Sequence, residues 1–132
     1  MQDSLAPVLN PALDADALAA QFARQGRLHI PDILTPGTAE RVYKCLTEET
    51  PWSLVYYKDG KRGDAHGLSL QERMHLAVGV WEYARENFSF FYDNHRISIN
   101  GEPYAGPVSY YGDIFAFLNS PQFLNLMRDR KS

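Results

Sequence analysis

The longest regular pattern of apolar and polar positions in the chain lies between residues 69 and 98. Large apolar residues recur there at alternating steps of four and three, which is the spacing of one face of an α-helix. These residues are Leu70, Met74, Ala77, Trp81, Ala84, Phe88 and Phe91. Ser69 and Glu72 form a capping-box sequence just before them. The pattern predicts a long central helix over about residues 70–92, with this stripe buried in the core.

The first half of the chain predicts four elements in order: an extended arm over residues 1–12, a helix over 14–25, a short strand over 27–30 and a helix over 36–49. Asp14 or Asp16 can cap the first helix, and Gly26 follows its last turn. Alternation of polar and apolar residues indicates the strand. Thr35 and Pro36 supply a cap and a first helical residue for the second helix.

The second half predicts a hairpin before the long helix, and a loop with two short helices after it. These elements are a strand over residues 52–57, a second arm or loop over 62–68, a loop over 93–112 that can include a strand over 96–99, and helices over 114–118 and from 121 onward. Asp59 and Gly60 form a hairpin turn sequence. Asp113 and Ser120 are the expected caps of the two short helices. Together the elements indicate a mostly helical α+β fold with a few short strands.

Length and composition change this picture little. The 132 residues correspond to one domain or part of one, and 45% hydrophobic with 22% charged residues is a globular composition. The formal net charge of −3 argues against nucleic acid or an anionic membrane as the main partner. Without a signal-peptide pattern or a spanning apolar run, a cytoplasmic protein is expected. The single cysteine, Cys45, excludes an internal disulfide and is expected to be a partly buried packing residue.

Two short motifs place a carboxylate and an imidazole two residues apart: Asp64 with His66, and Asp93 with His95. In a strand this spacing puts both side chains on one face, as metal ligands require. Neither pair has a third ligand fixed by the sequence, so solvated turns are the alternative interpretation. The chain also lacks the nucleophile elbow, the P-loop and the dinucleotide-binding glycines. The residues therefore assign no catalytic or cofactor-binding site, and these four are only candidate metal ligands.

Four segments, taken in order, resemble the N-terminal part of a prolyl-hydroxylase-like oxygenase of the iron(II)/2-oxoglutarate-dependent class. They are FARQGRLHIPDIL at residues 22–34, PWSLVY at 51–56, FSFFYDNHR at 88–96 and FLNSPQFL at 117–124. The resemblance extends over nearly the whole chain. It implies helices and lead-in strands that buttress a double-stranded β-helix, with the barrel itself absent from this chain.

The resemblance also implies an oxidoreductase, a dioxygenase that couples decarboxylation of 2-oxoglutarate to hydroxylation of a substrate. Its full-length members use Fe(II) and 2-oxoglutarate, with ascorbate. Their iron ligands, His-x-Asp/Glu and a later His, lie downstream of the segments matched here. No histidine of this chain is followed two residues later by Asp or Glu, so no catalytic, metal or cofactor residue carries over. The chain is expected to be a truncated portion, inactive alone.

Two other functions remain open at this point. The chain can be a small non-catalytic interaction module that uses an exposed apolar helix face, or a small metal hydrolase built on the Asp/His pairs. The expected partner is a missing C-terminal barrel or a second copy of the chain, which would cover the apolar helix face.

Overall fold

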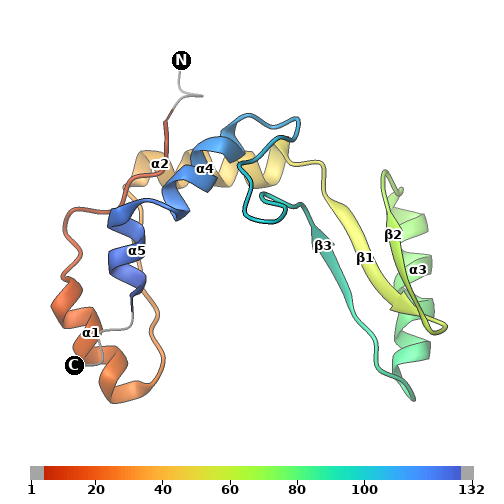
Figure 1. Cartoon of the computed structure of the whole chain (residues 1–132). Coiled ribbons are helices and arrows are strands. Elements are labelled where there is room, and N and C mark those ends of the chain that lie inside the picture. Colours follow the sequence, from red (N-terminus) through yellow and green to blue (C-terminus); the bar gives the residue numbers. More distant parts are fainter. Residues whose placement is uncertain (1–4, 129–132) are drawn as a thin grey trace. The chain divides into compact units, whose positions relative to one another are not determined.

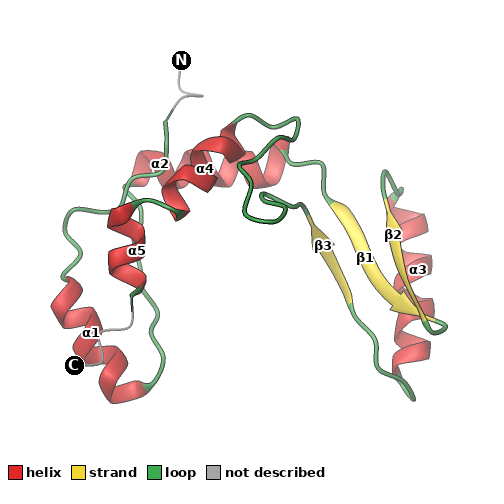
Figure 2. Ribbon diagram, in the orientation of Figure 1, coloured by secondary structure: helices red, strands yellow, loops and turns green. Residues whose placement is uncertain are grey.

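The computed structural model describes residues 5–128, and these fall into two compact units (Figure 1). The helical unit contains the described residues up to Glu49 and from Ile97 onward, and the strand–helix unit is Thr50–Arg96. Five α-helices and one three-stranded antiparallel sheet make up the described residues (Figure 2). The predicted α+β class is thus confirmed, and these residues form an open sheet rather than a barrel.

The helical unit contains four α-helices and one π-helical turn: α1(Ala15–Gln25), α2(Pro36–Lys44), η2(Cys45–Glu49), α4(Tyr110–Leu118) and α5(Pro121–Met127). The capping signals in the sequence placed the starts of three of them correctly, although Thr35 at the start of α2 makes no side-chain capping hydrogen bond. Asp14 accepts hydrogen bonds from two backbone amides at the start of α1, and Gly26 ends it with φ of 69°. Pro36 opens α2, and the Ser120 hydroxyl accepts a hydrogen bond from the Phe123 amide in α5.

Three predictions for this unit were wrong. Residues 27–30 are extended but form no strand, because no described residue pairs with their backbone; the bridge nearby joins Leu9 of the arm to Leu34. Residues 96–99 likewise form no strand. Helix α4 begins at Tyr110, four residues before the predicted start, so Asp113 lies in its first turn and does not precede the helix as a cap. The added turn includes Tyr110 and Tyr111, which are buried in the core.

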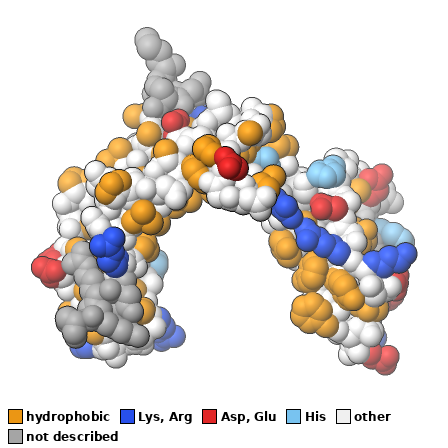
Figure 3. Space-filling model, viewed as in Figure 1, with side chains coloured by type: hydrophobic (Ala, Val, Ile, Leu, Met, Phe, Trp, Pro, Cys, Tyr) orange, Lys and Arg blue, Asp and Glu red, His pale blue; other side chains and the backbone are white. Residues whose placement is uncertain are grey.

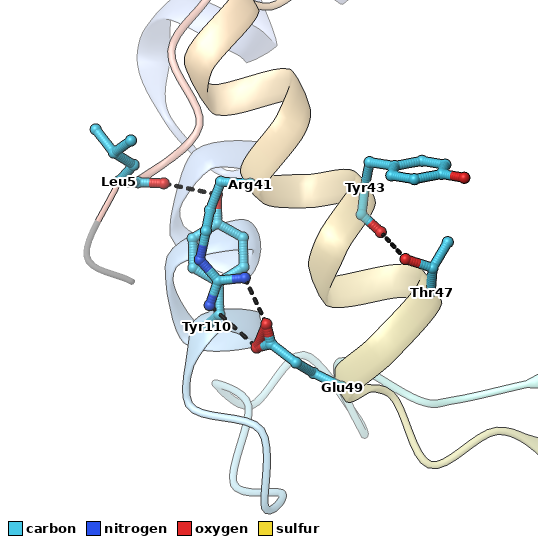
Figure 4. A network of polar contacts seen from close by, with 6 residues as sticks. All are labelled: Leu5, Arg41, Tyr43, Thr47, Glu49 and Tyr110. Carbon is cyan, nitrogen blue, oxygen red and sulfur yellow. Dashed lines mark hydrogen bonds and ion pairs between the residues drawn. The ribbon is translucent and has the colours of Figure 1, made fainter. Parts of the chain in front are cut away.

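Cys45, Tyr110 and Tyr111 form the buried centre of the helical unit. The Arg41 guanidinium lies 4.0 Å from the centroid of the Tyr110 ring and donates hydrogen bonds of 2.7 and 3.1 Å to Glu49 (Figure 4). The Tyr110 hydroxyl donates to the Leu5 carbonyl at 2.6 Å. Burial raises the pKa of Tyr110, and the nearby Arg41 charge opposes that rise. Cys45 is 0% exposed and clusters with Tyr110 and Tyr111, so it is more completely buried than expected.

The strand–helix unit contains a sheet of β1(Ser53–Lys58), β2(Lys61–Ala65) and β3(Phe91–Asn94) in the order β2-β1-β3. Asp59 and Gly60 join β1 to β2 with φ of 54° and 78°, as a two-residue hairpin with positive φ at both positions requires. The sequence predicted this hairpin. It did not predict β3, which pairs with β1 from the other side.

Helix α3(Leu70–Ala84) opens with the predicted capping box of Ser69 and Glu72. It is eight residues shorter than the predicted helix over 70–92, so that prediction was wrong. Beyond Ala84, Asn87 donates to the Tyr83 carbonyl and Ser89 donates to the Tyr57 carbonyl. Such side-chain hydrogen bonds compete with helix, and the alternating aromatics that follow favour a strand.

The predicted buried stripe of α3 was also wrong. Val80 is the helix's buried residue at 2% exposure, whereas its neighbour Trp81 is 71% exposed. A Cβ added at Gly79 would meet the Lys58 side chain of β1 at 3.0 Å. The helix thus approaches the sheet through an arc that contains small residues, and the large apolar residues turn away from it.

Candidate functional site

The two faces of the sheet differ. Directly opposite residues share a face, and the register places Leu54 beside Ala65 and Asp93, and Val55 beside Asp64 and Tyr92. Helix α3 covers the first face, since Arg73 contacts Asp93 there. Within residues 50–96, all of which the structure describes, the second face has a ring contact with a helix at Tyr57, whose ring centroid lies 6.2 Å from that of Tyr83 on α3, and the rest of this face is left open. We call this second face, which carries Ser53, Val55, Tyr57, Arg62, Asp64, Tyr92 and Asn94, the open face.

A hollow of about 160 Å³ lies at the end of the open face where β1 begins. Val55, only 1% exposed, contributes the one apolar side chain of the lining. The remaining lining residues are polar or charged and come from all three strands and the segments beside them: Ser53, Arg62, Asp64, His66, Asn94, His95 and Arg96. We call this feature the polar hollow.

The polar hollow brings together three of the four residues that the sequence proposed as metal candidates, Asp64, His66 and His95. Asp93 is separated from them, because its carboxylate accepts hydrogen bonds of 2.8 and 3.0 Å from Arg73 on the α3 side of the sheet. The hydrogen bond to Asp93 raises the pKa of Arg73. Since both side chains are about 40% exposed, this ion pair contributes little stability.

The polar hollow does not fit the iron centre that the oxygenase resemblance implies for the full-length family. That centre needs two histidines and a carboxylate on one ion. The described residues contain no group of three or more His, Cys, Asp or Glu side chains placed to hold a metal ion. The His66 ring instead shares a 2.9 Å hydrogen bond between Nδ1 and the Ser53 hydroxyl. The role of the Asp/His pairs as metal ligands therefore stays a prediction.

Sequence reasoning missed the two arginines of the polar hollow. Arg62 could have been found, because it stands two residues before Asp64 and four before His66, all on one face of a hairpin arm. Arg96 could not have been found, because its position depends on strand β3. The sequence predicted helix over residues 88–92, and that prediction excluded a strand there.

An aromatic row continues along the open face from the polar hollow. The Tyr57 and Phe90 ring centroids lie 5.8 Å apart, those of Phe90 and Tyr92 5.6 Å apart, and those of Phe88 and Phe90 6.1 Å apart. Phe88 is 77% exposed and so is not the core residue that the sequence predicted. Hydrophobic and basic side chains lie next to each other over this unit in Figure 3.

The helical unit carries a second, apolar hollow of about 390 Å³ between α1, residues 28–30 and α5. It is lined by Ala15, Leu18, Ala19, Phe22, Leu28, Ile30, Leu126, Met127 and Arg128. With one charged residue at its rim, this hollow offers apolar contact and no group suited to acid–base chemistry.

Across residues 5–128, none of the helices combines the length and the apolar character needed to cross a bilayer. Comparisons of the chain with protein-family models, with curated proteins and with solved structures gave no match.

Proposed function

We propose that this chain is the N-terminal structural portion of a prolyl-hydroxylase-like, Fe(II)/2-oxoglutarate-dependent dioxygenase, and that it is inactive alone. The proposal combines the four resembling segments with the absence of the family's His-x-Asp/Glu iron-ligand pair from the sequence. In such an enzyme these helices and strands would support a barrel that carries the iron ligands. The hydroxylation chemistry would then belong to that barrel.

The observation that carries the proposal is the incomplete sheet. A sheet is stable when both of its faces are covered or when one face is polar, and strand edges are normally protected. Here one end of the open face is polar, but the rest presents aromatic rings, and β2 and β3 are both edge strands of the sheet formed by the described residues. A further sheet packed on the open face would bury these rings, which is the arrangement that a barrel provides.

The extended segment over residues 27–30 supports the same proposal. Its polar–apolar alternation is that of a strand, yet it has no partner strand among the described residues. Leu28 and Ile30 line the apolar hollow instead. A strand supplied from outside the described residues could pair with this segment and cover that hollow.

Anaerobic calorimetry is expected to give no saturable heat when Fe(II) is titrated into the purified chain, with or without a fixed concentration of 2-oxoglutarate already present. Scattered surface histidines bind Fe(II) weakly when no third ligand is fixed beside them. The His66→Ala and His95→Ala variants should behave as the parent chain does. A one-to-one site that disappears in either variant would contradict the proposed inactivity and favour the small metal hydrolase.

A second candidate function, a non-catalytic interaction module, is favoured by one observation. Leu70, Met74, Val78 and Trp81 form one exposed apolar stripe on α3, each between 52% and 74% exposed. We call these four residues the α3 stripe. Four large apolar side chains in one row usually mark a contact surface, for a partner or for a second copy of the chain.

A further inference from the structure

We propose that the polar hollow binds a small oxyanion, a carboxylate or phosphate group, held between Arg62 and Arg96. Both arginines lie in the strand–helix unit and line the hollow. The proposal rests on residues 50–96 alone, so it stands or falls separately from the proposed relationship to an oxygenase.

The two arginines reach the polar hollow from opposite edges of the sheet. Arg62 lies on β2, Arg96 follows β3, and β1 runs between them. Arg41 and Arg73 each bind a carboxylate through two hydrogen bonds, but Arg62 and Arg96 have no such partner among the described residues. An anion held between two guanidinium groups that line one hollow is attracted by both, and these two attractions offset the repulsion between the like charges.

Hydrogen-bond donors also outnumber acceptors in the polar hollow. A guanidinium donates through five N–H groups and accepts none, and the Asn94 amide adds two donors to its one acceptor oxygen. The Ser53 hydroxyl and His66 Nδ1 are already occupied with each other. The single carboxylate of the lining is that of Asp64. A ligand rich in acceptor oxygens fits this lining best, and the planar fork of arginine suits carboxylate and phosphate groups.

The volume limits the ligand. Sites for drug-sized molecules usually measure about 300 Å³ or more, so a hollow of about 160 Å³ holds one oxyanion group rather than a whole nucleotide. Any apolar remainder of the ligand would lie along the aromatic row, beginning at Tyr92. The polar hollow would thus recognise the charged end of a small acid or phosphate ester.

The test is a nuclear magnetic resonance titration of the His66 and His95 imidazole signals. Inorganic phosphate and acetate are added in separate series at fixed pH, with ionic strength held constant by chloride. Saturable shifts of both rings with one common Kd are expected for at least one anion. Saturation by phosphate alone identifies a phosphate site, whereas saturation by acetate shows that a carboxylate suffices.

Substitutions of the lining residues distinguish a specific binding site from general attraction of anions to a basic surface. Arg62→Gln and Arg96→Gln should each raise the Kd about tenfold or more, since each removes a charged bidentate donor. Asp64→Asn should lower the Kd, because it removes the one negative charge from the lining. If Arg62→Gln disturbs the hairpin, Arg62→Lys keeps the charge and should weaken binding less.

The matched control is Arg85→Gln, which removes the same charge at the C-terminal end of α3. Tyr83 of that end accepts a hydrogen bond from the Gly60 amide, and Arg85 is not among the residues that line the polar hollow. Its Kd should equal that of the parent chain. Linear shifts with both anions, an equal loss in Arg85→Gln, or weaker binding by Asp64→Asn would overturn the proposal.

Discussion

Replacing Val80 by Asp is expected to unfold the strand–helix unit, whereas the same replacement at Trp81 is expected to leave it folded. Val80 is 2% exposed and follows Gly79, the α3 residue that lies against the Lys58 side chain of β1, while Trp81 is 71% exposed. Val80→Asp loses about 1.5–3 kcal/mol of burial and places a carboxylate where it has no partner, so a total above about 4 kcal/mol is expected. That is a large part of the stability of a small unit.

The Trp81→Asp variant is a close control, because both positions lie near the C-terminal end of α3 and carry the same change in charge and helix propensity. Its cost should stay within about 1 kcal/mol. Urea denaturation at low protein concentration, followed by tryptophan fluorescence, measures both variants, since Trp52 remains in the same unit. Similar urea midpoints for the two variants would mean that the helix face is assigned wrongly.

The purified chain is expected to self-associate through the α3 stripe and to bind a hydrophobic dye. Each 100 Å² of apolar surface that becomes covered on association contributes about 2.5 kcal/mol, so covering several hundred Å² can offset the cost of association, which is about 4–15 kcal/mol. A net charge of −3 is too small to prevent this by repulsion. Size-exclusion chromatography with light scattering should therefore give a mass above the 15.0 kDa of one chain.

Trp81→Asp should lower this mass toward that of a monomer and reduce dye binding, because it breaks the α3 stripe. His75→Asp is the control: His75 is also exposed on α3, outside the stripe, and the change adds the same charge. It should leave the mass unchanged. A parent chain that is a compact monomer, melts cooperatively and binds no dye would contradict self-association through the α3 stripe.

Local signals in the sequence predicted those parts of the fold that depend on near neighbours. The capping box at Ser69, the Asp14 cap and the Asp59–Gly60 turn are all present as expected. Each of these features depends on residues within four positions of one another, so a local sequence pattern is enough to predict it. The sequence predicted an end of α3 that is too late, because Phe88 continues the helical spacing of apolar residues. The neighbouring Asn87 and Ser89 favour the end of a helix.

The choice of helix face could not be predicted from spacing alone. Two adjacent arcs of α3 carry apolar residues, and the larger residues Met74 and Trp81 indicated the wrong one. Close approach to the sheet selects the arc that contains Gly79 and Val80 instead. A stripe of large residues shows where a helix carries most of its apolar area. Which face of the helix is buried depends on the element that packs against it.

The polar hollow was predictable on one side only. Asp64 and His66 share a face because they lie two apart in a hairpin arm, as their spacing indicated. Arg96 and His95 reach the same place through the pairing of β1 with β3, a contact between residues about forty positions apart. Pairing at that separation depends on the tertiary fold, which no local pattern encodes.

The proposed relationship to an oxygenase is tested most directly by the coding DNA that follows the Ser132 codon. Sequencing should reveal, in one of the three forward frames, a His-x-Asp or His-x-Glu pair with a histidine further on, within a segment of alternating apolar residues. That arrangement would supply strands for the barrel and the His-x-Asp/Glu pair that this sequence lacks. Downstream DNA that encodes no such pair in any frame would contradict the proposal and leave the interaction module as the function to pursue.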